Sequence, residues 1–360
     1  MPVQFVYGNQ DFIKGVYYDF GNTSRMISAS RFDAAIQAGW TDRMERGLFR
    51  YNLGDLQTRV LPGPCGFVAQ LNIKRGTERR KPQEILSIKQ DFNAEQFNFN
   101  LINPDEIIFE MMMDTEEGHE SNHQPCKIVV LVNVSPLEFG HCLFVPDPSR
   151  CFPQVLTKFA IQVGIQSVLL SSDPAFRVGF NSLGAFASVN HLHLHGYYLK
   201  HKLNIEYMPV RPLLPEKGFY TLVGFPAGFL FYTESDSVDE VATDICRVTD
   251  FLVEANVAHN LFMTRGCSPC GCTRSERDDS LSRNGVRIAV WPRLACFGTK
   301  EESALNVALC ELAGHLPFKN KTDYERSTES CVIETIQQYL LPNEDMLELE
   351  KQLTQHLSAL

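Results

Sequence analysis

The chain has 360 residues, of which 44% are hydrophobic and 21% are charged, and its formal net charge is −10. A negative chain lacks the basic surface that general binding to nucleic acids requires, so we expect no nucleic-acid partner. The longest apolar runs, such as 128–132, fall far short of the roughly 18 residues that a membrane helix needs. With no visible secretory signal and with eleven cysteines expected to be reduced, the sequence predicts a cytoplasmic protein without a membrane partner.

The first helix is expected to begin after Ser30. Apolar residues recur there at every fourth position, and Asp33 is placed to form a capping box with Ser30. These apolar residues are Phe32, Ile36, Trp40, Met44 and Leu48. Farther along, β-branched and apolar runs predict strands, and one long apolar run predicts a helix at 153–171. The expected strands are 66–73, 127–134, 142–145, 177–180 and 189–199.

Two polar segments lie between these elements. The basic cluster Lys74, Arg75, Arg79, Arg80 and Lys81 is most simply a solvated charged loop, and attraction of a diphosphate or free phosphate is the alternative. The acidic stretch 114–126 is expected to be a surface loop.

The second part of the chain repeats the mixture of strands and helices. Strands are expected at 228–232, 260–263 and 286–291, and helices at 237–252, 301–312 and 344–357. Ser237 and Glu240 are spaced for a capping box. Residues 267–284 are expected to form a mobile loop, and zinc binding by its Cys267, Cys270 and Cys272 is a weaker alternative. We therefore predict an α+β fold with mostly antiparallel strands, divided into 1–204 and 205–360.

Three histidines alternate with leucines in this sequence, at His191, His193 and His195. In an extended strand they would share one face, while the leucines point into a core. Three such positions span about 13 Å, too far for all three rings to bind one ion, so we expect no metal. A neutral imidazole is a good nucleophile toward phosphorus near pH 7, which favours covalent catalysis. A histidine-rich strand without chemical function remains the third interpretation.

The triplet and its surroundings resemble the histidine triad (HIT) superfamily of nucleotide hydrolases and transferases. The resemblance includes the triplet 191–197 and the upstream segments 133–136, 140–141, 145–146, 180–182 and 187–189. Segments 97–100, 179–184, 188–199 and 308–317 closely resemble the animal GDP-D-glucose phosphorylase family. That family is related to plant GDP-L-galactose phosphorylases and, more distantly, to galactose-1-phosphate uridylyltransferases.

The resemblance implies a HIT-like fold, with a catalytic half at 1–204 and a degenerate HIT-like half at 205–360. It implies that GDP-glucose and inorganic phosphate are converted to GDP and glucose 1-phosphate through a guanylylated histidine. No cofactor is expected, and a homodimer is a candidate assembly.

By the family motif, His193 is the expected nucleophile. His191 and His195 flank it and are expected to bind or protonate oxygens. Ser188 matches a phosphate-contacting position, while Asn133 and Asn181 match nucleotide-contacting positions. For His141, a buried hydrogen-bonded histidine and a direct role in the site are equally supported.

The third histidine departs from the transferase pattern. Uridylyltransferases and the plant enzymes usually carry glutamine where this chain has His195. Glutamine cannot donate a catalytic proton, whereas histidine can assist water, so the triplet alone leaves phosphorolysis and hydrolysis open. A nucleotide-sugar hydrolase and a non-catalytic nucleotide-binding protein are therefore the alternatives to the phosphorylase.

Overall fold

The structure is a computed structural model, and it describes residues 2–16, 29–114, 127–269, 283–298 and 305–359. Most of its strands form one eleven-stranded sheet in the order β1-β4-β5-β6-β8-β7-β12-β13-β11-β10-β9. All neighbours in it are antiparallel except β1 and β4. The predicted α+β class with mostly antiparallel strands is thus confirmed. The strands are β1 Gln4–Tyr7, β4 Ile107–Met113, β5 Ile128–Val132, β6 Cys142–Pro146, β7 Phe176–Asn181, β8 Leu194–Tyr198, β9 Val210–Leu214, β10 Phe219–Leu222, β11 Phe229–Thr233, β12 Ala258–Gly266 and β13 Gly285–Arg293.

The same strand order occurs twice in this sheet. The first half runs β4-β5-β6-β8-β7, with helix α3 (Lys158–Leu170) between β6 and β7 in the chain. The second half runs β9-β10-β11-β13-β12, with helix α4 (Val238–Glu254) between β11 and β12. The halves join where β7 pairs with β12 and Asn181 lies opposite Asn260. The predicted boundary at 204/205 falls in a short turn before β9, and the division into two domains stays a prediction.

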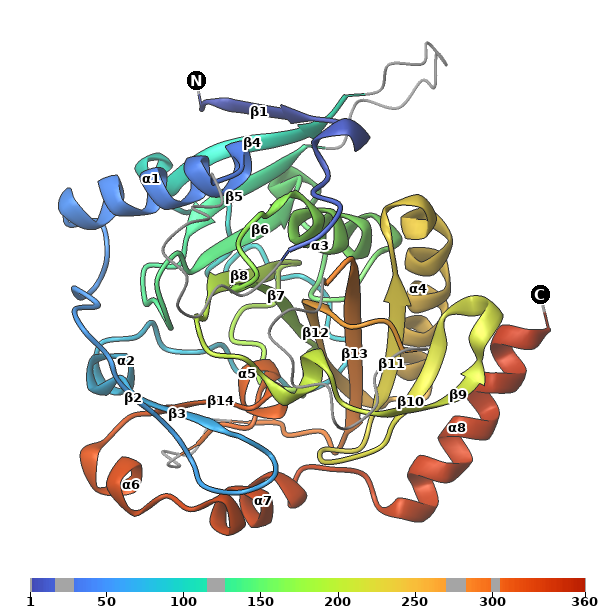
Figure 1. The fold of residues 1–360 in the computed structure, drawn as a ribbon. Coiled ribbons are helices and arrows are strands. Elements are labelled where there is room, and N and C mark those ends of the chain that lie inside the picture. Colours follow the sequence, from blue (N-terminus) through green and yellow to red (C-terminus); the bar gives the residue numbers. More distant parts are fainter. Residues whose placement is uncertain (1, 17–28, 115–126, 270–282, 299–304, 360) are drawn as a thin grey trace, which may run out of the picture.

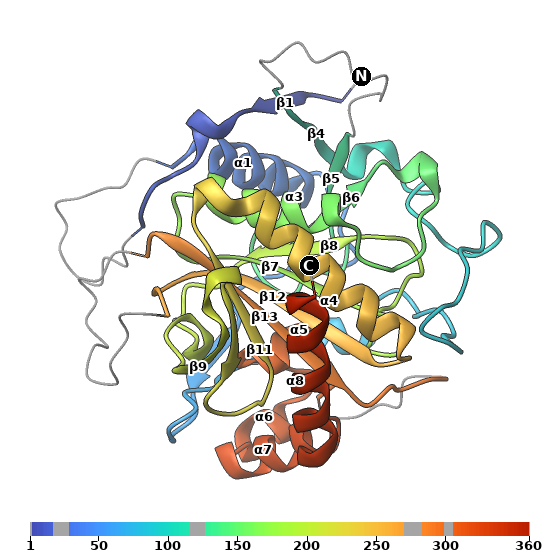
Figure 2. The same cartoon turned by 90° about the vertical axis from the view of Figure 1, so that its right-hand side faces the viewer.

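Four helices cover one face of the large sheet (Figures 1 and 2). They are α1 (Arg31–Glu45), α3, α4 and α8 (Asn343–Ser358), and their apolar sides share one core with the sheet. In α4 the predicted stripe is buried, because an apolar residue recurs at every third or fourth position. The stripe consists of Val238, Val241, Ile245, Val248 and Leu252. No helix among the described residues is long and apolar enough to cross a membrane.

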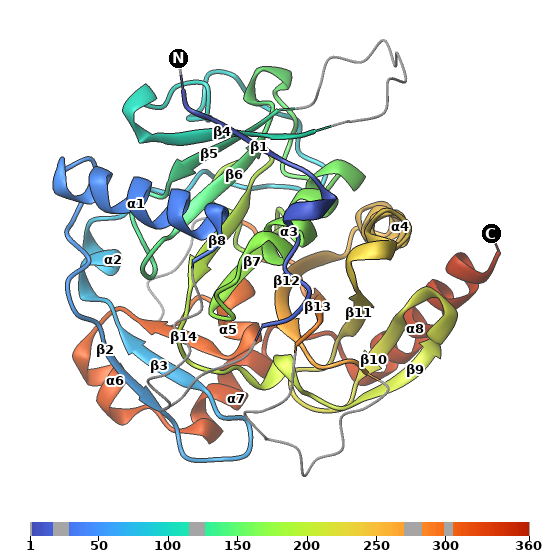
Figure 3. The same ribbon diagram turned by 45° about the horizontal axis from the view of Figure 1, so that its top comes forward.

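A second, three-stranded sheet packs on the opposite face (Figure 3). Its order is β14 (His315–Phe318), β3 (Val68–Leu71) and β2 (Gln57–Val60), so it joins strands from both ends of the chain. Short helices accompany it, namely α2 (Ile73–Thr77), α5 (Leu309–Ala313), α6 (Lys321–Arg326) and α7 (Glu329–Gln337). In β8, Leu194 belongs to the helix-side core and Tyr197 to the core beneath the second sheet. Since strand side chains alternate, His195 faces the second sheet.

Both predicted capping boxes are wrong in part. Ser30 caps α1, because its Oγ accepts from the Asp33 N–H, but the Ser30 N–H donates to Ser172. The Asp33 carboxylate instead accepts hydrogen bonds from Ser171, Ser172 and Tyr198. In α4 the Ser237 side chain makes no cap. At the start of α1, distant partners replaced the local ones, whereas the Ser237 hydroxyl lies 3.2 Å from that of nearby Thr233.

Other predicted boundaries also change. The helix expected at 153–171 begins only at Lys158, and the strand expected at 189–199 begins only at Leu194. Both changes have the same reason. Residues 152–154 form hydrogen bonds with residues 190–193, and these bonds hold both segments in irregular conformations. Only Leu309–Ala313 of the helix expected at 301–312 is helical, and residues 301–304 lie outside the described part. The loop positions 115–126, Cys270 and Cys272 also lie outside it.

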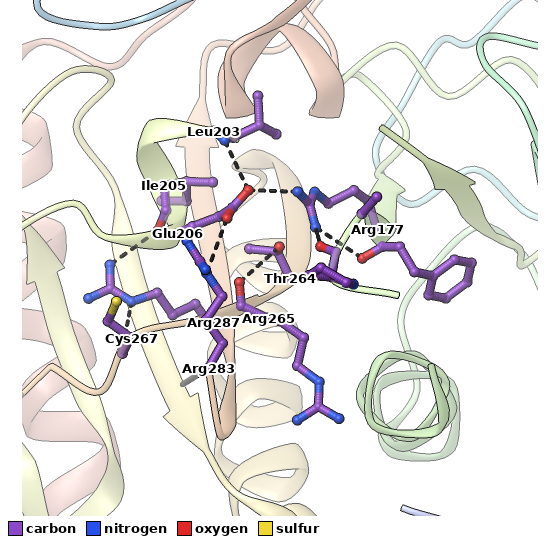
Figure 4. A network of polar contacts seen from close by, with 12 residues as sticks. Arg177, Leu203, Ile205, Glu206, Thr264, Arg265, Cys267, Arg283 and Arg287 are labelled. Carbon is purple, nitrogen blue, oxygen red and sulfur yellow. Dashed lines mark hydrogen bonds and ion pairs between the residues drawn. The ribbon is translucent and has the colours of Figure 1, made fainter. Parts of the chain in front are cut away.

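A buried charged cluster fixes the connection between the halves (Figure 4). The Glu206 carboxylate lies 2.6 Å from the guanidinium of Arg177 on β7 and 3.4 Å from that of Arg283, just before β13. It also accepts from the Leu203 N–H at 2.9 Å. Arg287 on β13 donates to the carbonyls of Ile205 and Cys267. These contacts tie the turn between the halves to strands of both.

Candidate active site

His193 lies just before β8, and its backbone groups form hydrogen bonds with a glutamine side chain instead of with a neighbouring strand. The His193 N–H donates to Gln154 Oε1 at 2.9 Å, and Gln154 Nε2 donates to the His193 carbonyl at 3.1 Å. The same Nε2 donates to the carbonyl of Asn181 at 3.0 Å. Because Gln154 and His193 are both buried, these bonds satisfy backbone groups that water cannot reach. They fix the position of the His193 main chain.

The imidazole of His193 is oriented and kept neutral. Its Nδ1 lies 2.7 Å from the carbonyl oxygen of His191. A carbonyl only accepts, so Nδ1 carries the hydrogen and Nε2 keeps its lone pair. Burial lowers the pKa of His193 from 6.5 to about 4, against a smaller opposite effect of the His191 carbonyl. A neutral imidazole with a free lone pair on Nε2 at pH 7 is a nucleophile.

A chain of hydrogen bonds also fixes the tautomer of His195. The Leu137 N–H donates to His141 Nδ1 at 2.8 Å, so the neutral His141 ring carries its hydrogen on Nε2. Burial, followed by the charge of Arg75, lowers the His141 pKa well below 6.5. His141 Nε2 lies 3.1 Å from His195 Nδ1, which therefore accepts. The amide nitrogen of Asn133 is farther from Nε2, at 3.3 Å. His195 accordingly carries its hydrogen on Nε2.

His191 does not share the cleft with the other two histidines. Its Nδ1 accepts from the Phe99 N–H at 3.0 Å, and its ring packs between Phe92 and Phe99. Burial lowers its pKa to about 4. The expected common strand face for all three rings is therefore wrong, because residues before Leu194 leave the strand. What His191 offers His193 is its carbonyl group.

The cleft lies between the large sheet and the α5–β14 segment. His193 and His195 line it together with all four predicted binding residues, Asn133, His141, Asn181 and Ser188. The second half of the chain supplies a further part of the wall, Asn306, Ala308, Leu309, Cys310, Glu311, Pro317 and Lys319.

Asn181 connects the two parts of this wall. Its Oδ1 accepts from the Leu309 N–H at 2.9 Å and from Asn260 Nδ2 at 2.6 Å. Both partners belong to the second half of the chain, whereas the Asn181 carbonyl is held by Gln154. Asn181 thus lines the cleft and also joins the halves behind it.

Sequence reasoning missed two residues of the site, Gln154 and Glu311. Gln154 lies in a segment that reads as part of an apolar helix, so no local signal marks it. Glu311 is buried, and its carboxylate accepts from the Ala308 N–H at 2.9 Å. Burial raises its pKa. Glu311 lies within a segment used only for the family resemblance, where its place in the cleft could not be inferred.

No group of three or more histidine, cysteine, aspartate or glutamate side chains in the described part of the chain is arranged to hold a metal ion. Cys267, the described member of the predicted cysteine cluster, is buried on the Arg287 side of the molecule. The absence of a metal from the reaction stays a prediction.

Comparison with known proteins identifies two family matches along the chain. Residues 31–197 match the family described as "GDPGP1-like, N-terminal domain", and residues 205–360 match "GDPGP1-like, C-terminal domain". Together they cover most of the chain.

Several curated relatives match over nearly the whole chain. GDP-D-glucose phosphorylase 1 of Danio rerio is 59% identical, covering 97% of this chain and 97% of that protein. The Homo sapiens protein of the same name is 47% identical over 94% of this chain and 88% of its own length. GDP-L-galactose phosphorylase 1 of Arabidopsis thaliana is 30% identical, covering 82% of this chain and 67% of that protein.

The fold is also similar to that of a solved structure, yeast Ap4A phosphorylase Apa2. The TM-score is 0.57 and the sequence identity 13%, and the match covers 87% of this chain and 98% of that one. At this identity the likeness concerns the fold alone.

Proposed function

The chain belongs to the GDPGP1-like family, and from that membership we propose that it is a GDP-D-glucose phosphorylase. The reaction converts GDP-glucose and inorganic phosphate into GDP and glucose 1-phosphate. One observation carries the mechanism beyond the family name. The His193 ring is neutral, holds its hydrogen on Nδ1 and leaves Nε2 available in the cleft.

In the first step, Nε2 of His193 attacks the phosphorus that bears guanosine, and glucose 1-phosphate leaves. The N–P bond forms as the bond to the bridging oxygen breaks. The ring then carries positive charge, which the carbonyl of His191 stabilises through Nδ1–H. Splitting the displacement into two steps lets one cleft serve both the leaving group and the acceptor.

In the second step, inorganic phosphate attacks the same phosphorus and GDP is released. The new P–O bond forms as the N–P bond breaks, and the electron pair returns to Nε2. Nδ1 keeps its hydrogen throughout, so His193 acts as a nucleophile and transfers no proton.

The proposed roles of the other site residues are based on their positions in the cleft. His195 carries a hydrogen on Nε2 and donates it as a hydrogen bond to a phosphoryl oxygen, where negative charge grows in the transition state. We assign a phosphate contact to Ser188 and nucleotide contacts to Asn133 and Asn181, and their positions in the lining of the cleft support these roles. His141 acts through His195, since its ring is hydrogen-bonded on both sides.

Hydrolysis by the same histidine is the rival function, because His195 stands where related transferases carry glutamine. The leaving group in the first step is a phosphate monoester, which departs as an anion without taking up a proton. An N–H donor that does not transfer its proton is therefore sufficient for phosphorolysis. Water as the acceptor would have to lose a proton to a base.

Product analysis with and without phosphate tests the proposal. We expect GDP and glucose 1-phosphate to form only when phosphate is present. Denaturation at alkaline pH without phosphate should trap GMP covalently on the peptide that contains His193, because the N–P bond is stable in base and hydrolyses in acid; His193→Ala should abolish both the adduct and turnover. Equal formation of GMP with and without phosphate would show a hydrolase, and tight guanine-nucleotide binding without turnover would show a binding protein.

The cytoplasmic location and a homodimer belong to the same proposal. The predicted duplication of a HIT-like unit does too, and the repeated strand order of the large sheet supports it. The location is supported by the expectation of reduced cysteines.

A further inference from the structure

Positively charged side chains from two distant segments gather on one side of the cleft. Arg75, Arg79 and Lys81 follow β3, and Lys319 follows β14. We propose that these four side chains, here called the cationic wall, bind the inorganic phosphate that accepts the guanylyl group. This inference rests on the proposed phosphorylase function and names the site of its second substrate.

The second sheet brings the two segments together. β3 and β14 are parallel neighbours with Leu71 opposite Phe318, so both strands end at the same edge. The Asn72 N–H donates to the Phe318 carbonyl at 2.8 Å and continues the pairing past that edge. Gly76 permits the approach, since a Cβ there would lie only 3.0 Å from the Cβ of Lys319. Lys319 therefore packs directly beside the segment that carries Arg75 and Arg79.

Arg75 contributes positive charge to the cleft, and the acceptor of its hydrogen bond is a carbonyl group rather than a carboxylate. Its guanidinium donates to the carbonyl of Ser135. The charge of Arg75 contributes to the lowered pKa of His141 and opposes the rise in the pKa of Glu311. It therefore influences groups on both sides of the cleft. Glu311 is the one carboxylate among the described residues that line the cleft, and burial raises its pKa. The charge balance of the lining therefore favours an anion.

A series of contacts connects Arg75 to the reactive histidine. The Ser135 N–H donates to Asn133 Oδ1 at 3.0 Å, and the Asn133 amide lies 3.3 Å from His141. His141 bonds to His195, whose ring centre is 5.0 Å from that of His193. The cationic wall and the nucleophile are thus parts of one contiguous site.

The next arginine in the segment has a different role. The guanidinium of Arg80 lies over the ring of Phe97, 3.4 Å from its centre, and burial lowers the Arg80 pKa. This cation–π contact holds the segment that carries Arg79 and Lys81 against Phe97. The predicted basic cluster is therefore divided, because Lys74 turns toward the Asn52 carbonyl and lines a separate hollow.

Phosphate needs such a wall, whereas water does not. A phosphate dianion must approach a phosphorus that already carries negative oxygens, and fixed cations offset that repulsion. Because each displacement is in line, glucose 1-phosphate leaves and phosphate enters on the side of the phosphorus opposite His193, so the incoming phosphate occupies the place that the phosphate of glucose 1-phosphate has left. Its attacking oxygen bonds to phosphorus as the bond to Nε2 of His193 breaks, and any proton it carries stays on GDP. The wall therefore sets the ratio of GDP to GMP.

The test measures how GDP formation depends on phosphate in Arg79→Gln and Lys319→Gln. We expect the phosphate concentration for half-maximal GDP formation to rise about tenfold or more in each variant, since each loses a charge-assisted hydrogen bond. The KM for GDP-glucose should rise less, because guanosine and glucose provide further contacts. At low phosphate, the GMP fraction should increase.

Matched controls lie on the same two segments. Lys74→Gln removes a cation from α2, and Lys321→Gln removes an exposed cation that pairs with Glu325. Both should keep the wild-type phosphate dependence. Release of glucose 1-phosphate without phosphate, together with thermal unfolding, should show that every variant is folded and forms the guanylylated histidine.

The outcomes separate this inference from the function on which it rests. An unchanged phosphate dependence in both wall variants, with a phosphorolytic wild type, would overturn the cationic wall alone. A larger KM for GDP-glucose with an unchanged phosphate dependence would assign the wall to the sugar nucleotide and would also overturn it. A wild type that ignores phosphate would refute the phosphorylase itself.

Discussion

At the scale of the residue, the three histidines differ in what they contribute. His193 presents Nε2, His195 presents an N–H group, and His191 contributes its carbonyl while its ring supports Phe99. The hydrogen bonds made by the opposite side of each ring decide these differences. Burial keeps the rings of His191 and His193 neutral.

We predict that guanylylation loses activity near pH 4 rather than near pH 6.5, because the pKa of His193 is lowered to about 4. The measurement is the rate of the glucose 1-phosphate burst without inorganic phosphate. Leaving phosphate out ensures that its own ionisation does not affect the pH profile. An acid limb near pH 6.5 would show that His193 is as accessible to protons as a free imidazole.

The same shift predicts how stability depends on pH. Between pH 6.5 and about 4 the unfolded chain binds protons that the folded chain excludes, so the free energy of unfolding falls as the pH falls. His191 and His259, whose pKa values are also lowered to about 4, act in the same direction. Urea unfolding at pH 7 and pH 5 measures the difference in the free energy of unfolding. The burst rates described above should be measured only at pH values at which the chain remains folded.

At the scale of the element, the site depends on irregular backbone rather than on a regular strand. Residues 190–193 lie outside β8, and the segment 152–154 accepts hydrogen bonds from the N–H groups of Leu192 and His193. The Asn190 side chain accepts from the Gln154 N–H and donates to the carbonyls of Gln90 and Asp91. Two buried amide side chains therefore replace the ladder that a strand would supply.

We predict that Gln154→Ala lowers the free energy of unfolding by about 3 kcal/mol, since three buried hydrogen bonds to backbone groups are lost. Turnover should fall at least about tenfold, because the His193 backbone is no longer fixed. Gln162→Ala is the control, since Gln162 bonds to the exposed Asp239 and should change stability by less than about 0.5 kcal/mol. Equal effects of the two variants on turnover would contradict the positioning role of Gln154.

At the scale of the whole molecule, both halves build one sheet and one site. The pairing of β7 with β12 joins the halves, and Asn181 reaches Leu309 and Asn260 across the junction. The buried cluster around Glu206 holds the connecting turn against both. The second half is thus needed for the cleft, because it supplies part of the lining and Lys319.

We predict that Glu206→Gln lowers the free energy of unfolding by about 3–5 kcal/mol, because Arg177 and Arg283 keep buried charge without their carboxylate. Unfolding should remain a single transition, because the two halves share the large sheet. Glu350→Gln removes a more exposed ion pair with Arg211 and should cost less than about 1 kcal/mol. Equal losses in the two variants, measured by urea unfolding, would refute the importance of the buried cluster.

The sequence by itself determined features that depend on local periodicity. The α4 stripe, α8 and the antiparallel α+β class follow from repeating apolar positions, and the alternation in β8 correctly separates Leu194 from His195. The motif also identified residues that line one cleft in the structure, namely His193, His195, Asn133, Asn181, Ser188 and His141.

Only the tertiary structure decided which distant surfaces meet. Gln154 acts on His193, the His191 ring turns to Phe99, and Lys319 joins Arg75 at the edge of the second sheet. Periodicity shows which side of an element is buried, but not which partner buries it. Partners that are far apart in the chain are chosen by packing and by the need to satisfy buried polar groups, so no local pattern records them.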